Sequence, residues 1–289
     1  MSRSDRTLEC IIYLLLAVLV IVTLYPLLYV VFASLSDGDQ LMAHTGLMWR
    51  PLGFSTLAYE RALANPSIWT GYWNTLRLVA GGLLLNLTLT VTGGYVLSRR
   101  GALWTRPMMM AIIATMFINA GIIPFYLVVR ELGLINSLWS LLLPFAVKTF
   151  HLIIVRTAFL SLPSELEESA EIDGASHLTL LLRIILPLSM PVIAVLLLYT
   201  AADKWNMWFI PSVFIQDRTL YPLQLVLREI LINNVTDQIS SGAGVGEAQK
   251  IGETIKYATI VIATLPVLLV YPFLQKHFVK GALVGALKG

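Results

Sequence analysis

The densest group of carboxylates in this chain lies in residues 161–183. Five of them surround two small residues, Ala170 and Gly174, which lie four positions apart: Glu165, Glu167, Glu168, Glu171 and Asp173. Carboxylates pair strongly with Arg and Lys, and small residues four apart on a helix expose backbone to close approach by another surface. The segment is therefore predicted to contact a basic surface on a partner protein.

Local signals predict a short helix in the same segment. Ser164 and Glu167 have the spacing of a capping box directly after Pro163, so the helix should start at Glu165. Gly174 should end it, since glycine takes the left-handed conformation that follows many helices. The alternative is a solvated acidic loop.

A second group of polar residues lies in an otherwise apolar stretch. Lys148 and His151 are three positions apart and share a helix face. An unpaired Lys at membrane depth costs about 2.5–3.5 kcal/mol on insertion scales, so this face should meet a wet interior. The two residues are predicted to line a translocation path that hydrogen-bonds or attracts an anionic solute. The alternatives are structural pairing with a neighbouring helix and a misplaced span.

A third group, residues 203–208, combines a carboxylate, an amide and aromatic rings. Sugar sites commonly use these three kinds of group together. Asp203, Trp205 and Asn206 are therefore candidates for the same path. The alternative is an interfacial aromatic belt, which suits Trp208 better.

Other chemistry is missing from the sequence. It contains no Gly-x4-Gly-Lys-Ser/Thr phosphate loop, and its four histidines lack metal-ligand spacing. Its single cysteine, Cys10, excludes an intramolecular disulfide. The chain is therefore expected to be no enzyme and to bind no cofactor itself.

The elements that position these groups must be membrane helices. The 289 residues are 57% hydrophobic and 13% charged, against roughly 25% charged in a soluble domain, and the net charge of +3 does not suggest a nucleic-acid surface. This composition predicts an all-α polytopic membrane protein. A span needs about 20 apolar residues, which predicts six: about 10–35, 74–98, 107–129, 138–160, 184–208 and 257–275. The first is too long for a signal peptide and is expected to remain as an anchor.

The distribution of Lys and Arg predicts the orientation of the spans. The termini and the turns 99–106 and 161–183 hold nine Lys and Arg in 56 residues, and the opposite side holds six in 91. Both termini are therefore expected in the cytoplasm, with outer loops at 36–73 and 209–256. The sequence offers no internal boundary, so residues 1–289 are expected to form one membrane domain.

The spacing in the acidic turn resembles a known signature. Glu168-Ser169-Ala170 is followed by three residues, Gly174, nine residues and Ile184-x-Leu186-Pro187. This resembles the EAA motif of inner-membrane permeases of binding-protein-dependent ABC importers, Glu-Ala-Ala-x3-Gly-x9-Ile-x-Leu-Pro, with Ser169 replacing an alanine. Other segments look like the carbohydrate-uptake permeases, and within those like the branch for complex oligosaccharides and uronides: Tyr25-Pro26-Leu27, Trp73-Asn74-Thr75, Leu97-Ser98-Arg99-Arg100, Tyr221-Pro222-Leu223-Gln224 and residues 280–289.

The resemblance implies a type I ABC importer permease in a bacterial cytoplasmic (inner) membrane. It implies a second permease subunit, two ATP-binding subunits that hold ATP and Mg²⁺, an external solute-binding protein and a carbohydrate substrate, with alginate-type uronides among the candidates. It also implies that the acidic helix docks on an ATP-binding subunit through a set of coupling residues: Glu165, Glu167, Glu168, Ser169, Ala170, Glu171, Asp173, Gly174, Leu186 and Pro187. A stand-alone secondary transporter or channel, or an importer of another solute, is the alternative.

Overall fold

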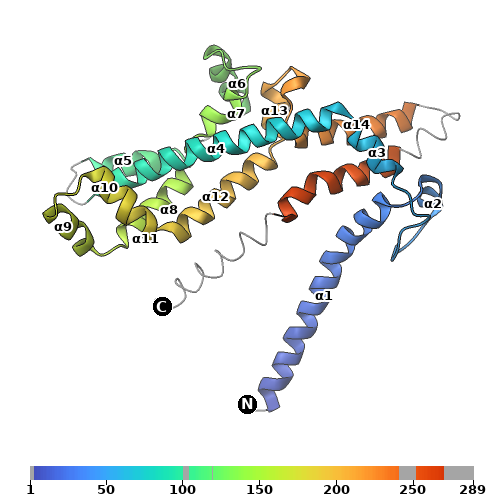
Figure 1. Cartoon of the computed structure of the whole chain (residues 1–289), viewed down its shortest axis with the longest axis horizontal. Coiled ribbons are helices and arrows are strands. Elements are labelled where there is room, and N and C mark those ends of the chain that lie inside the picture. The colour runs from blue at the N-terminus through green and yellow to red at the C-terminus, as the bar shows by residue number, and fades with distance from the viewer. Residues whose placement is uncertain (1–2, 100–103, 119, 241–251, 270–289) are drawn as a thin grey trace. The chain divides into compact units, whose positions relative to one another are not determined.

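The fold is helical throughout the part of the chain that the computed structural model describes, which is residues 3–99, 104–118, 120–240 and 252–269. Within these ranges, extended backbone pairs only at an isolated bridge between Ser36 and Phe54. The all-α prediction is confirmed. The helices group into two compact units, Met1–Trp69 with Val226–Val267 and Thr70–Leu225 with Leu268–Gly289 (Figure 1).

The first unit begins with a long apolar helix. Its helices are α1 (Arg3–Ser34), α2 (Gly38–Ala43), α3 (Leu57–Leu63), most of α14 (Leu223–Ser240) and the helix Gly252–Leu269. The candidate span Leu8–Ser34 in α1 has a mean hydropathy of 2.8. The described part of the chain buries none of its most apolar window. A helix this apolar needs lipid or another subunit around it.

Packing in the first unit starts at the end of α1. Ala33 is buried there with Leu41 and Met48, which follow α1 in the chain. The rings of Tyr29 and Tyr257 meet edge to face, with centroids 5.9 Å apart. The predicted outer loop therefore folds back on the end of α1.

The second unit is built along α4 (Pro66–Ser98), shown in cyan in Figure 1. An added Cβ at Gly82 would lie 2.9 Å from Lys204 Cγ, and one at Gly94 would lie 2.6 Å from Val155 Cγ1. These glycines let neighbouring helices approach α4 closely. The other elements are α5 (Thr105–Ala114), α6 (Ile122–Glu131), α7 (Trp139–Leu142), the 3₁₀ turn Leu143–Phe145, α8 (Thr149–Leu160), α9 (Ser164–Ile172), α10 (His177–Leu180), the π-helical turn Leu181–Ile185, α11 (Leu186–Leu188), α12 (Met190–Trp205), α13 (Phe209–Phe214) and the 3₁₀ turn Arg218–Leu220.

Three of the predicted spans are continuous helices that are long and apolar enough to cross a membrane: Leu8–Ser34, Pro66–Ser98 and Gly252–Leu269. The second of them begins at Pro66, well before the predicted residue 74, so part of the predicted outer loop is helical. Residues 270–275 of the last predicted span lie outside the described residues.

Two further predicted spans are bent helix pairs. Trp139–Phe145 and Thr149–Leu160 meet at 45°, and His177–Leu188 and Met190–Trp205 meet at 83°. The second bend falls at Ser189, between Pro187 and Pro191, which both lack the N–H that a continuous helix needs. Counting each pair as one span gives up to five spans within the described residues.

The span predicted over 107–129 is not one continuous helix. The structure has two ten-residue helices there, α5 and α6. Gly121 takes the left-handed φ of +81° before α6, and the Pro124 ring would clash with the residue 120 carbonyl in an unbroken helix. Hydropathy alone does not reveal such a break.

Candidate functional site

The second unit contains an open cavity of about 740 Å³ beside the bend between α7 and α8. Its walls combine aromatic rings with a few charged and amide groups, the mixture expected of a sugar site. The lining residues are Phe145, Lys148, Phe150, His151, Tyr199, Ala202, Asp203, Asn206, Met207, Trp208, Phe209 and Ile210. Four of the five predicted path residues are among them.

An ion pair lies in the cavity wall. Lys148 Nζ is 3.0 Å from Asp203 Oδ2, and the two side chains keep 33% and 39% of their surface exposed. Lys148 has an extended backbone directly before α8. It therefore lies at a helix break, whereas the sequence predicts that it lies within a span. Lys148 thus pairs with a neighbouring helix, as the alternative interpretation predicts, but both side chains still line the cavity.

His151 is held by a buried amide. Its Nδ1 lies 3.2 Å from Asn86 Oδ1, which also accepts a hydrogen bond from Thr200 Oγ1 at 3.1 Å. Asn86 Nδ2 donates to the Ala146 carbonyl at 3.0 Å. One side chain of α4 thus joins α8, α12 and the turn between α7 and α8. Asn86 is not among the residues predicted from the sequence, although an amide in an apolar span is the signal of such a link.

Lys204 is a second residue beside the cavity that was not predicted from the sequence. Its side chain is 2% exposed, and its Nζ donates to the Leu141 carbonyl at 2.6 Å and lies 5.2 Å from the centre of the Phe145 ring. Together with Lys148 and Asp203 it gives this side of the cavity one more cation than anion.

Trp205 and Asn206 point to different surroundings. Trp205 is buried and its ring meets Tyr72 edge to face, with centroids 6.2 Å apart, so it is not among the cavity-lining residues. Asn206 does line the cavity, and its amide donates to the Ala202 carbonyl at 2.8 Å. The ring that Trp205 was expected to supply comes from Trp208.

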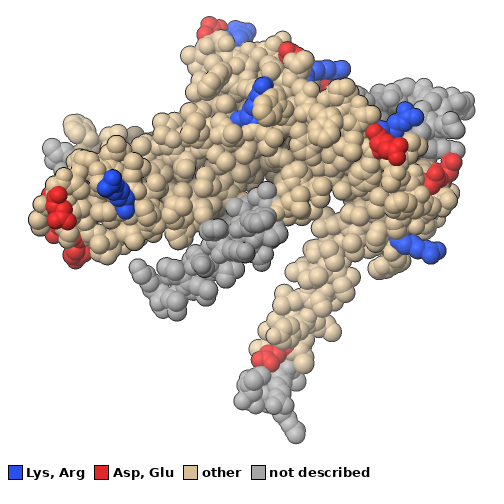
Figure 2. All heavy atoms as spheres, in the orientation of Figure 1, with Lys and Arg blue, Asp and Glu red and all other residues tan. Residues whose placement is uncertain are grey.

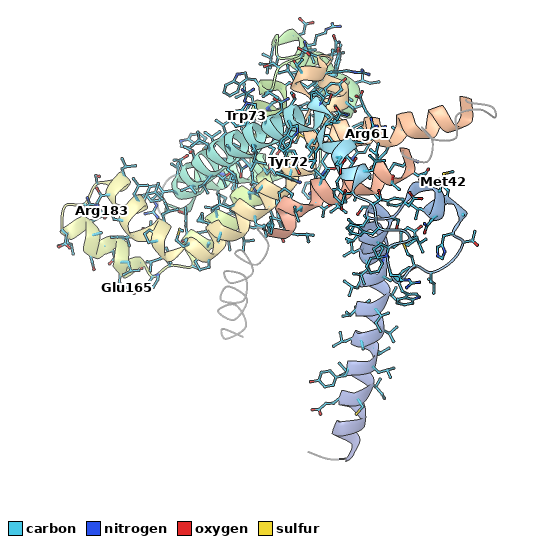
Figure 3. All side chains as sticks on the ribbon, turned by 45° about the vertical axis from the view of Figure 1, so that its right-hand side comes forward. Met42, Arg61, Tyr72, Trp73, Glu165 and Arg183 are labelled. Carbon is cyan, nitrogen blue, oxygen red and sulfur yellow. The ribbon has the colours of Figure 1, made fainter. Side chains whose placement is uncertain are left out.

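The acidic turn lies at the other end of the second unit. In Figure 3, Glu165 and Arg183 lie at one end of this unit, and Tyr72 and Trp73 lie toward the other. Figure 2 shows acidic side chains gathered at the α9 end, followed by a surface with few charges. The exposed members of the predicted coupling set are Glu165, Glu168, Ser169, Glu171, Asp173, Gly174 and Pro187.

The end of the acidic helix agrees with the prediction, but its start does not. The Gly174 N–H donates to the Glu171 carbonyl at 3.0 Å and the Ala175 N–H to the Ala170 carbonyl at 2.9 Å, and Gly174 has a φ of +74°. This is a Schellman ending. The predicted capping box is wrong: α9 starts at Ser164, its N-cap is Pro163, and no side-chain hydrogen bond caps it in the described structure.

Three members of the coupling set pack within the chain instead of facing a partner. Ala170 is 6% exposed and packs with Val155 and Phe159, so it and Gly174 do not form one open stripe. Glu167 binds Arg99 of the same chain through two contacts of 2.7 Å. Leu186 is half-buried beside the same apolar core.

Comparison with known proteins supports a transport role. Residues 90–283 match the model of the family described as the binding-protein-dependent transport system inner membrane component. A polygalacturonan/rhamnogalacturonan transport system permease of Bacillus subtilis is 37% identical over 99% of this chain and 100% of its own length.

Solved structures give the same result. In the crystal structure of a bacterial ABC transporter involved in import of the acidic polysaccharide alginate, one chain is 32% identical, with a TM-score of 0.88 over 96% of this chain and 99% of that one. A chain from a bacterial alginate ABC transporter in complex with a pentasaccharide-bound periplasmic protein, 16% identical with a TM-score of 0.62 over 94% of each chain, shares the fold. This chain therefore belongs to the family of binding-protein-dependent transport system inner membrane components, and it has the fold of an ABC importer permease.

Proposed function

We propose that this chain is one permease subunit of an ATP-driven importer of acidic oligosaccharides. The observation that carries the proposal is the Lys148–Asp203 pair in a cavity lined by aromatic rings, with buried Lys204 behind it. Aromatic faces pack on sugar rings, and the extra cation favours carboxylates. The transport of acidic polysaccharides by the similar proteins supports this choice of substrate.

The proposal includes the rest of the transporter. A second permease subunit completes the path, an external solute-binding protein delivers the sugar, and two ATP-binding subunits hold ATP and Mg²⁺ and carry out hydrolysis. The exposed carboxylates of α9 contact an ATP-binding subunit, which places the turn and both termini in the cytoplasm. The density of Lys and Arg supports that orientation.

Two opposite substitutions test the substrate class. Lys148→Met lowers the local charge from one excess cation to zero, whereas Asp203→Asn raises it to two. Uptake of a uronic oligosaccharide and of a neutral one of equal length is measured in proteoliposomes with all partners present. Because the pair is partly exposed and screened, we expect the preference for the acidic sugar to fall about five- to tenfold in Lys148→Met and to hold or rise in Asp203→Asn.

The control is Arg130→Met. It removes a cation that pairs with Glu131 at 3.4 Å and does not line the cavity, so the preference should not change. Equal losses for both sugars in both cavity variants would contradict an acidic substrate and would make the ion pair structural.

A further inference from the structure

The side chain of Arg99, just beyond the end of α4, links that helix to the acidic helix α9. Its two terminal nitrogens donate to the two carboxylate oxygens of Glu167, each at 2.7 Å. The side chains are only 17% and 25% exposed. Paired bonds of this kind fix orientation as well as distance, and partial burial protects them from screening by salt.

A second contact ties the other side of the Gly174 turn to the same helix. The Arg99 guanidinium lies over the Tyr95 ring, 4.2 Å from its centre. The Tyr95 hydroxyl lies 3.2 Å from Nδ1 of His177, the first residue of α10. We call these four residues, Arg99, Glu167, Tyr95 and His177, the Arg99 clamp. It holds both α9 and the start of α10.

The end of α4 that carries the clamp is itself held to α8. Arg156 Nε donates to the Leu97 carbonyl at 2.9 Å, and Gly94 lets Val155 approach the α4 backbone. Asn86, which binds the cavity residue His151, lies twelve residues before the end of α4, or about 18 Å along the helix. A rigid helix therefore joins the clamp to the cavity wall.

We infer that the Arg99 clamp makes α9 and the inner part of α4 move as one body, so that force received by α9 reaches the cavity through α4. The inference rests on the proposed function, in which α9 contacts an ATP-binding subunit. Arg99, Glu167, Tyr95 and His177 are positioning residues here, and Glu167 serves the permease itself instead of the partner.

Charge reversal within the clamp tests this inference. Arg99→Glu and Glu167→Arg each place like charges together, and the double variant restores the attraction. Solute imported per ATP hydrolysed is measured in proteoliposomes, along with the amount of assembled transporter. We expect each single variant to lower the ratio at least about fivefold and the double variant to return it to within about twofold of wild type, because paired groups are not additive. The control is Arg130→Glu with Glu131→Arg, an exposed pair of adjacent residues.

A merely stabilising clamp would give a different result. The single variants would then assemble in smaller amounts, but each assembled transporter would keep the wild-type ratio, and this would overturn the inference. If the single variants do not assemble, Glu167→Gln and Tyr95→Phe keep the side-chain shapes and should lower the ratio about two- to threefold, since each loses hydrogen-bond strength. A wild-type ratio in both would also overturn it.

Failure of the proposed function and failure of the clamp would give different experimental results. Import of acidic sugar by the wild-type chain tests that function, and its absence would refute it. The clamp is judged by comparing reversed and restored pairs, and the stimulation of ATP hydrolysis by the external binding protein allows that comparison whichever solute is carried. Equal stimulation in single and double variants would refute the clamp alone.

Discussion

One added methyl group on Gly94 tests the contact between α4 and α8. The Cβ of Gly94→Ala would lie 2.6 Å from Val155 Cγ1, 3.2 Å from Val155 Cβ and 3.4 Å from the backbone nitrogen of Arg156. Val155 is fully buried, and a β-branched side chain has one strongly preferred rotamer in a helix. Overpacking of this kind costs about 1–3 kcal/mol, and a gain of up to about 1 kcal/mol in helix propensity offsets only part of it.

Gly93→Ala is the matched control for this substitution. Its Cβ would meet only Leu152 Cδ1, at 3.2 Å, which is the end of a flexible side chain. Thermal unfolding of the purified transporter, followed by tryptophan fluorescence, should show a midpoint lower by about 2–6 °C for Gly94→Ala and unchanged or higher for Gly93→Ala. Adding Val155→Ala to Gly94→Ala should recover part of the loss, because the two sites share one contact. Equal midpoints for the two alanine variants would refute the steric reasoning.

Three further outcomes are expected. Gly174→Val should insert normally but import less solute per ATP, because a left-handed backbone costs a β-branched residue about 1–2 kcal/mol, whereas Gly174→Asn should stay near wild type. Asn86→Leu leaves the buried Ala146 carbonyl unpaired and should lower the unfolding midpoint through a loss of about 1–3 kcal/mol, and adding Thr200→Val should cost little more. Glu168→Lys should reduce copurification of the ATP-binding subunit, with partial rescue by an acidic residue on the partner, and undiminished copurification would place Glu168 outside the interface.

Several local signals in the sequence predict the structure accurately. The apolar runs give the helical class and the positions of α1 and α4, and the glycine at 174 ends α9 as expected. The helix breaks at Lys148 and Gly121 are harder to predict, because both positions lie inside stretches that are long and apolar enough to count as spans. A local pattern reflects the composition of one segment. Where the backbone bends depends as well on the segments that pack against it.

Contacts between distant segments and the ends of helices account for the other predictions that the structure corrects. The capping box at Ser164 fails because Glu167 binds Arg99, which lies 68 positions away, and no local pattern contains that alternative. The exchange of Trp205 for Trp208 arises where a helix ends. Helical periodicity places a side chain only while the helix continues, and α12 ends at Trp205, so the three residues after it follow another direction.

The buried ammonium group of Lys204 also bears on how the chain is made. A buried ammonium group without a hydrogen-bond acceptor is costly, and here the acceptor is the Leu141 carbonyl. Synthesis runs from the N-terminus, so the segment that carries this carbonyl is made before residue 204. The bend after α7 thus prepares a docking point for a helix that is synthesised later. The final surroundings of Lys204 therefore need residues of both the fourth and the fifth predicted span.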